Sequence, residues 1–150
     1  MKQYAVITAS YWGFTLTDGA LRMLVVLYFH QLGYSPLEIA MLFLFYEFFG
    51  IVTNLFGGWL AARLGLASTL LMGLCLQIVA LSMLLVDEAM LSVPYVMLAQ
   101  ALSGIAKDLN KMSAKSGVKL VVAEEAESQL YRWVSALTGS KNALKGIGFF

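Results

Sequence analysis

The segment LGLASTLLMGLCLQIVALSMLLV, Leu64–Val86, contains 23 consecutive residues without one ionised side chain. A helix of about 20 apolar residues is long enough to cross the hydrocarbon core of a bilayer, which is roughly 30 Å thick. Helices satisfy all of their backbone hydrogen bonds internally, as a lipid environment requires. The segment therefore predicts a transmembrane helix.

The whole chain has the composition of an integral membrane protein. Of its 150 residues 60% are hydrophobic and 13% are charged, against about 25% charged residues in soluble domains. These values exclude a soluble enzyme, a nucleic-acid-binding protein and a disordered linker, and a net charge of +1 predicts no polyanion partner. Because Cys75 and His30 are the only residues of their kinds, we expect no disulfide framework, no metal site, no cofactor and no catalysis.

Four complete membrane spans and part of a fifth are predicted, so we expect an all-α membrane protein that forms one truncated N-terminal bundle over residues 1–150. The expected spans cover about 4–30, 37–62, 67–86, 91–117 and 129–150. Between the first two, Gly33 is expected to end one helix, and Ser35 and Pro36 to begin the next as N-cap and first-turn residue.

Lysine and arginine are distributed unevenly between the two sides of this topology. The expected loops around residues 31–37 and 86–90 contain none of the ten basic residues. Loops rich in basic residues stay in the cytoplasm. We therefore predict that the N-terminus and the loop at 118–128 are cytoplasmic, and that the first span is not a cleaved signal peptide.

Polar side chains recur every three or four residues within these spans, which places them on one face of each helix. The first span carries Thr8, Tyr11, Thr15, Asp18 and Arg22, the fourth carries Gln100, Ser103, Lys107, Asn110, Lys111 and Lys115, and the fifth carries Lys141 and Lys145. On the second span, Glu47 and Asn54 share a face with Gly50 and Gly57. The aromatic residues of segment 43–49 are expected to be lipid-facing or helix-packing surface.

Five basic side chains lie deep within the predicted spans, where a charge that faces lipid costs on the order of 3 kcal/mol. They should therefore face a bundle interior or a wet cavity, and we predict that they bind an anionic substrate. The five are Arg22, Lys107, Lys111, Lys141 and Lys145.

Three acidic residues are expected to pair with these cations or to handle a coupling ion, for which protons are the candidate. Asp18 can pair with Arg22 one turn away, and Asp108 can pair with Lys107 or Lys111. For Glu47, structural pairing and proton handling remain equally open. A purely structural ion-pair role for all of these charges is the alternative to an anion site.

Two segments resemble motifs of the major facilitator superfamily. Gly58–Ala67 resembles the Gly-x-x-x-Asp-Arg-x-Gly-Arg-Arg/Lys loop between spans two and three, with both glycines and Arg63 present but Ala62 in place of the aspartate. Gln100–Gly104 resembles the fourth-span motif Arg-x-x-x-Gly, with glutamine in place of arginine. The resemblance implies a secondary-active transporter with alternating access, of which this chain would be about a third.

Longer strings resemble the organoarsenical efflux permeases of arsenic-resistance operons. They are Leu16–Arg22, His30–Pro36, Phe45–Gly50, Gly104–Ser116 and Thr138–Gly146. This resemblance implies export of 1-arseno-3-phosphoglycerate across the bacterial inner membrane, and hence arsenate resistance. That substrate carries both a phosphate and an arsenate group, which agrees with the anion site predicted from the basic residues.

Two other functions remain open. A drug/proton antiporter of the same superfamily would have an aromatic cavity with few cations. A non-transporting membrane scaffold would have its polar faces closed by ion pairs, without an accessible cavity.

Overall fold

The computed structural model describes residues 2–122 and 127–147, and every regular element in that part of the chain is a helix. The helices are α1 (Lys2–Gln31), α2 (Pro36–Leu42), α3 (Leu44–Leu64), α4 (Leu66–Met83), α5 (Val93–Val122) and α6 (Glu127–Ile147), with a short 3-10 helix at Glu88–Met90. The prediction of an all-α protein is confirmed. The predicted loop at 118–128 and the predicted span 129–150 fall partly outside the described residues, at 123–126 and 148–150.

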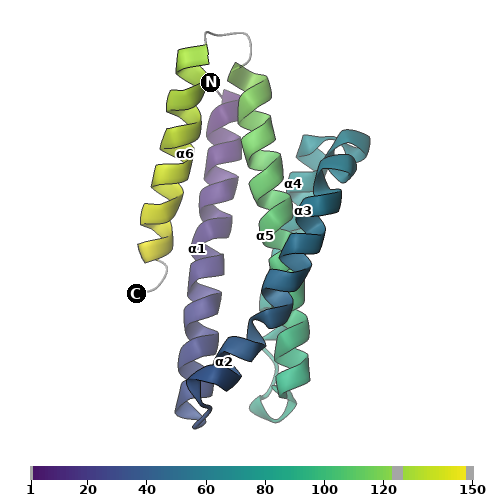
Figure 1. Ribbon diagram of the computed structural model, residues 1–150, viewed down its shortest axis with the longest axis vertical. Helices are drawn as coiled ribbons and strands as arrows, with labels where there is room; N and C mark the ends of the chain where they lie inside the picture. Colours follow the sequence, from purple (N-terminus) through teal and green to yellow (C-terminus); the bar gives the residue numbers. More distant parts are fainter. Residues whose placement is uncertain (1, 123–126, 148–150) are drawn as a thin grey trace.

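Helix α5 is central to the bundle, because it contacts α1, α2, α3, α4 and α6. Figure 1 shows α1, α3, α5 and α6 running roughly along the long axis, with α6 beside α1 and with α4 behind α3 and α5. Two apolar clusters lie at different heights of α1. One contains Tyr11 with Ala114 and Leu137, and the other contains Phe29 with Val96. The polar residues of α1 between these clusters border the cavity described below.

The turn between α1 and α2 forms as the sequence predicts. Gly33 has φ +85°, and its N–H bonds to the carbonyl of His30 while the N–H of Tyr34 bonds to the carbonyl of Phe29. This is the Schellman arrangement that ends many helices. Ser35 then caps α2 in a capping box with Glu38, and Pro36 lies in the first turn. The predicted helix end and helix start are confirmed.

The second predicted span, about 37–62, corresponds to Pro36–Leu64, and within it the structure has two helices that meet at Phe43. The N–H of Phe43 bonds to the carbonyl of Ala40, three residues earlier, so the last turn of α2 is tightened. In Figure 1, α2 is tilted relative to α3. The aromatic segment that follows this break therefore begins a new helix.

Two described segments are long and apolar enough to cross a bilayer by length and composition, Pro36–Leu64 and Leu66–Met83. Large apolar side chains such as Leu55, Phe56 and Ile78 are exposed on them. Such side chains suit contact with lipid. Helices α1, α5 and α6 instead combine apolar residues with the polar faces described above.

Candidate substrate-binding cavity

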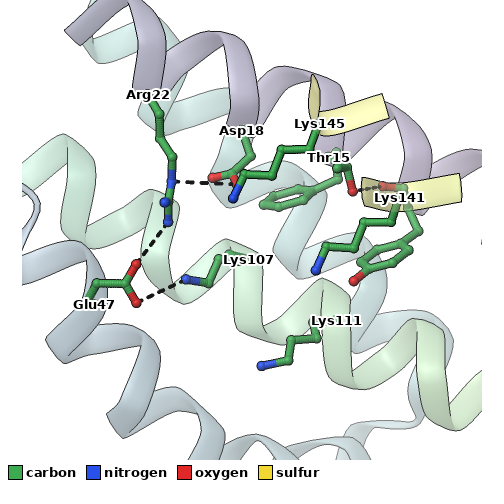
Figure 2. A pocket seen from close by; sticks show the side chains of 10 residues that line it. Thr15, Asp18, Arg22, Glu47, Lys107, Lys111, Lys141 and Lys145 are labelled. Carbon is green, nitrogen blue, oxygen red and sulfur yellow. Dashed lines mark hydrogen bonds and ion pairs between the residues drawn. The ribbon is translucent and has the colours of Figure 1, made fainter. Parts of the chain in front are cut away.

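A cavity of about 290 Å³ lies between α1, α3, α5 and α6. This volume is close to the lower end of the range for small-molecule sites, about 300–1,000 Å³. Its lining residues are Tyr11, Phe14, Thr15, Asp18, Arg22, Glu47, Lys107, Lys111, Lys141 and Lys145. All five basic residues that the sequence singled out therefore line one cavity, together with two of the three acidic residues. Figure 2 shows their side chains converging from four helices.

Helix α1 contributes one wall of the cavity through its polar face. Tyr11, Thr15 and Asp18 are buried there, at successive turns of the helix. The hydroxyl of Thr15 donates to the carbonyl of Tyr11, 2.8 Å away, and so satisfies its hydrogen-bonding capacity within the helix. The spacing of polar residues in the sequence thus correctly indicates which side of α1 is buried in the bundle.

Glu47 of α3 bridges the cations of two other helices. Its carboxylate accepts a hydrogen bond from Nη2 of Arg22 at 3.0 Å and one from Nζ of Lys107 at 3.4 Å. Asp18 is the second acid near Arg22, with 3.9 Å between Oδ2 and Nε. The predicted Asp18–Arg22 pair is therefore present, and Figure 2 shows Glu47 between Arg22 and Lys107.

Asp108 lies beside the cavity, buried between α3 and α5. Its Oδ1 accepts hydrogen bonds from Nδ2 of Asn54 at 3.1 Å and from Nζ of Lys111 at 3.3 Å. A Cβ atom on Gly50 would lie 2.5 Å from Oδ2 of Asp108, so the glycine makes room for this carboxylate. Of the two partners left open from the sequence, Lys111 pairs with Asp108, whereas Lys107 pairs with Glu47.

Lys141 and Lys145 project into the cavity from α6. Lys141 forms no ion pair within residues 2–122 and 127–147, and the charges that act on it include Lys145, Lys111 and Lys115. Lys115 itself is not among the lining residues. Mutual repulsion between these lysines makes an anion a favourable addition to this side of the cavity.

Within the aromatic segment, Tyr46 takes the helix-packing role and two neighbouring phenylalanines take the exposed one. Phe45 and Phe48 are exposed, as expected of lipid-facing residues, but Tyr46 is fully buried and its hydroxyl donates to Oδ1 of Asp18 at 2.6 Å. Its ring also lies against the guanidinium of Arg22 and the ammonium of Lys107. The sequence offers one sign that Tyr46 is buried beside the cavity, which is its position next to Glu47 in a run of otherwise apolar aromatic residues.

The polar face predicted for the fourth span divides into two parts in the structure. Lys107 and Lys111 line the cavity, but Ser103 of α5 is buried against α4, where its hydroxyl donates to Oε1 of Gln77 at 2.9 Å. Asn110 likewise lies against Gly73 of α4. The periodicity correctly indicated that Ser103 and Asn110 are buried, but it did not reveal that they pack against a different helix from Lys107 and Lys111.

The cavity wall carries more basic than acidic groups. Five cations and two carboxylates line it, which leaves an excess of positive charge. Nε of Arg22 is buried and has no hydrogen-bond acceptor among the described residues. Arginine and lysine bind phosphate-like groups through charge-assisted hydrogen bonds. Within the described part of the chain, no group of three or more His, Cys, Asp or Glu side chains could hold a metal ion.

The structure is a helical bundle with a charged cavity between its helices, which is a common position for ligand sites in helical bundles. The family model of the Major Facilitator Superfamily matches residues 7–137. The chain therefore belongs to the major facilitator superfamily, whose members are membrane transporters rather than enzymes. Comparison with curated proteins and with solved structures finds no match.

Proposed function

We propose that this chain is part of a transporter that exports an organic anion with an oxyanion group at each end. The observation that carries the proposal is the cavity wall, in which five cations from three helices face two carboxylates. Such an excess of positive charge within a membrane protein is costly unless an anion or water compensates it. Alternating access around this site would move the anion across the membrane.

The arrangement of the lysines supports a ligand with two charged ends. Lys107 and Lys111 lie on successive turns of α5, and Lys141 and Lys145 lie on successive turns of α6. We propose that each pair binds one oxyanion. Glu47 and Asp18 would orient the cations while the cavity is empty, and Glu47, Asp18 or Asp108 would take up protons if transport is coupled to them.

The proposed substrate is 1-arseno-3-phosphoglycerate, which forms when glyceraldehyde-3-phosphate dehydrogenase uses arsenate in place of phosphate. The resemblance of the sequence strings to organoarsenical efflux permeases supports this choice, and the positive cavity agrees with it. Export of this compound from the bacterial cytoplasm through the inner membrane would confer arsenate resistance. The drug/proton antiporter alternative expects few cations in the cavity, and the scaffold alternative expects no cavity.

Growth of an arsenate-sensitive bacterial strain that expresses the complete protein tests this function. The unchanged protein should raise the tolerated arsenate concentration, and Lys107→Gln and Lys141→Gln should each lower it again. Loss of one hydrogen bond to a charged group costs about 1.5–3 kcal/mol, roughly a tenfold to hundredfold loss of affinity.

The matched control is Arg132→Gln, because Arg132 is an exposed cation on α6 outside the cavity wall. Membrane extracts must contain equal amounts of each variant. If Lys107→Gln and Lys141→Gln protect cells as well as Arg132→Gln does, the cavity lysines do not bind the exported compound and the proposal fails.

A further inference from the structure

Tyr46 lies at the point where α1, α3 and α5 meet. Its side chain has no exposed surface, and its backbone is so close to Gly104 of α5 that a Cβ atom there would lie 2.9 Å from the carbonyl carbon of Tyr46. The hydroxyl donates to Asp18 of α1 at 2.6 Å. The backbone contact with Gly104 and the hydrogen bond to Asp18 together fix the position of the ring between the three helices.

Two cavity cations lie over this one ring. The guanidinium carbon of Arg22 is 4.1 Å from the ring centroid, and Nζ of Lys107 is 4.2 Å from it. Both distances are well within the roughly 6 Å over which a cation is attracted to an aromatic face. The attraction is stronger where water is scarce, as it is around the fully buried ring of Tyr46.

A cation held by an aromatic face keeps its charge and its N–H groups available to a ligand, whereas a cation held by a carboxylate does not. Glu47 occupies N–H groups of Arg22 and Lys107 and cancels charge, so an incoming anion must compete with it. The ring of Tyr46 carries no net charge and accepts no conventional hydrogen bond at its face. It can therefore hold two mutually repelling cations near one another while leaving their charge available to a ligand.

We propose that Tyr46 is a positioning residue that holds Arg22 and Lys107 as a cation pair for the anion, through the electrostatics of its ring. This inference rests on the proposed function, because it assumes that the cavity binds an oxyanion. According to this inference, recognition of a charged group at this side of the cavity depends on an aromatic residue of α3 as well as on the basic residues.

A fluorination series at position 46 of the complete protein tests the proposal. Phenylalanine and its mono-, di- and trifluorinated forms have nearly the same shape, but each fluorine weakens the negative potential of the ring face. The probes are 3-phosphoglycerate and inorganic phosphate, and their binding to the purified protein is measured by calorimetry. Tyr46→Phe is the reference, since it keeps the ring and removes the hydrogen bond to Asp18.

We expect affinity to fall with each added fluorine, by roughly 25-fold over the series if each of the two cation–π contacts contributes about fivefold. The same series at Phe48, which is exposed on the same helix, should leave affinity unchanged. Equal midpoint temperatures of thermal unfolding along the series would show that folding is unaffected. A ring with a purely structural role would then give the same affinity for every fluorinated form.

Two results would contradict the inference in different ways. If the unchanged protein binds a probe but affinity is the same for all fluorinated forms, Tyr46 does not position the cations electrostatically, and the proposed function is untouched. If the unchanged protein binds neither probe, the proposed anion site fails, and the role of Tyr46 fails with it.

Discussion

Replacing Gly104 with alanine is expected to force α3 and α5 apart. The added Cβ atom would overlap the backbone carbonyl oxygen of Tyr46 and would lie 2.9 Å from its carbonyl carbon and 3.0 Å from its Cα. Favourable contact between carbon atoms begins near 3.5 Å. Because the atoms that are met belong to a helix backbone, no side-chain rotation relieves the overlap, and one helix must move by roughly an ångström.

The expected loss of stability is the balance of overpacking and helix propensity, and two other glycines serve as comparisons. Overpacking costs about 1–3 kcal/mol, and the higher helix propensity of alanine offsets up to about 1 kcal/mol. Because the overlap is with a backbone, the upper part of the overpacking range, about 2–3 kcal/mol, applies, and we expect Gly104→Ala to lower the free energy of unfolding by about 1–2 kcal/mol. Gly57→Ala should cost less, because its Cβ would meet the flexible thioether of Met112 at 2.7 Å. Gly139→Ala should be neutral or stabilising, since nothing lies within 4 Å.

The assay is unfolding of the purified complete protein in detergent micelles, followed by circular dichroism, with anion affinity measured on the same samples. Gly104→Ala should also weaken binding, because the displaced backbone carries Tyr46 and Glu47, which contact Arg22 and Lys107. If Gly104→Ala is as stable as Gly57→Ala and binds anions equally well, the close approach of α3 and α5 at this point is incorrect.

Two further predictions concern the charges of α1 and the orientation of the chain. Asp18→Asn and Arg22→Gln should each impair transport, and the double variant should lose less than the sum of the two, since the side chains are 3.9 Å apart; additive losses would show that they do not interact. With Cys75→Ser as background, a cysteine placed at Tyr34 should react with an impermeant thiol reagent in intact cells, because the loop it occupies lacks basic residues. Labelling only after the membrane is permeabilised would reverse the predicted orientation.

Much of the candidate site could be predicted from the sequence because charges are costly in lipid. Arg22 and Lys141 are more than a hundred residues apart in the chain, yet the same cost argues that each faces away from lipid. The structure shows that both line the same cavity, from α1 and α6. Tyr46 could not be predicted in this way, since a tyrosine among phenylalanines is as compatible with a lipid-facing surface as with a buried contact.

The sequence by itself determines the helical class, the segments that are long and apolar enough to cross a membrane, and the polar faces of the helices. These properties depend on backbone hydrogen bonding and on a period of 3.6 residues, both of which are local. The tertiary structure alone decides that Glu47 joins Arg22 to Lys107, across 25 and 60 residues of chain. It also decides that Ser103 packs against α4, whereas Lys107, one helical turn later, lines the cavity. The physical reason is that polar side chains in a membrane bundle need partners, and their partners come from whichever helices pack beside them.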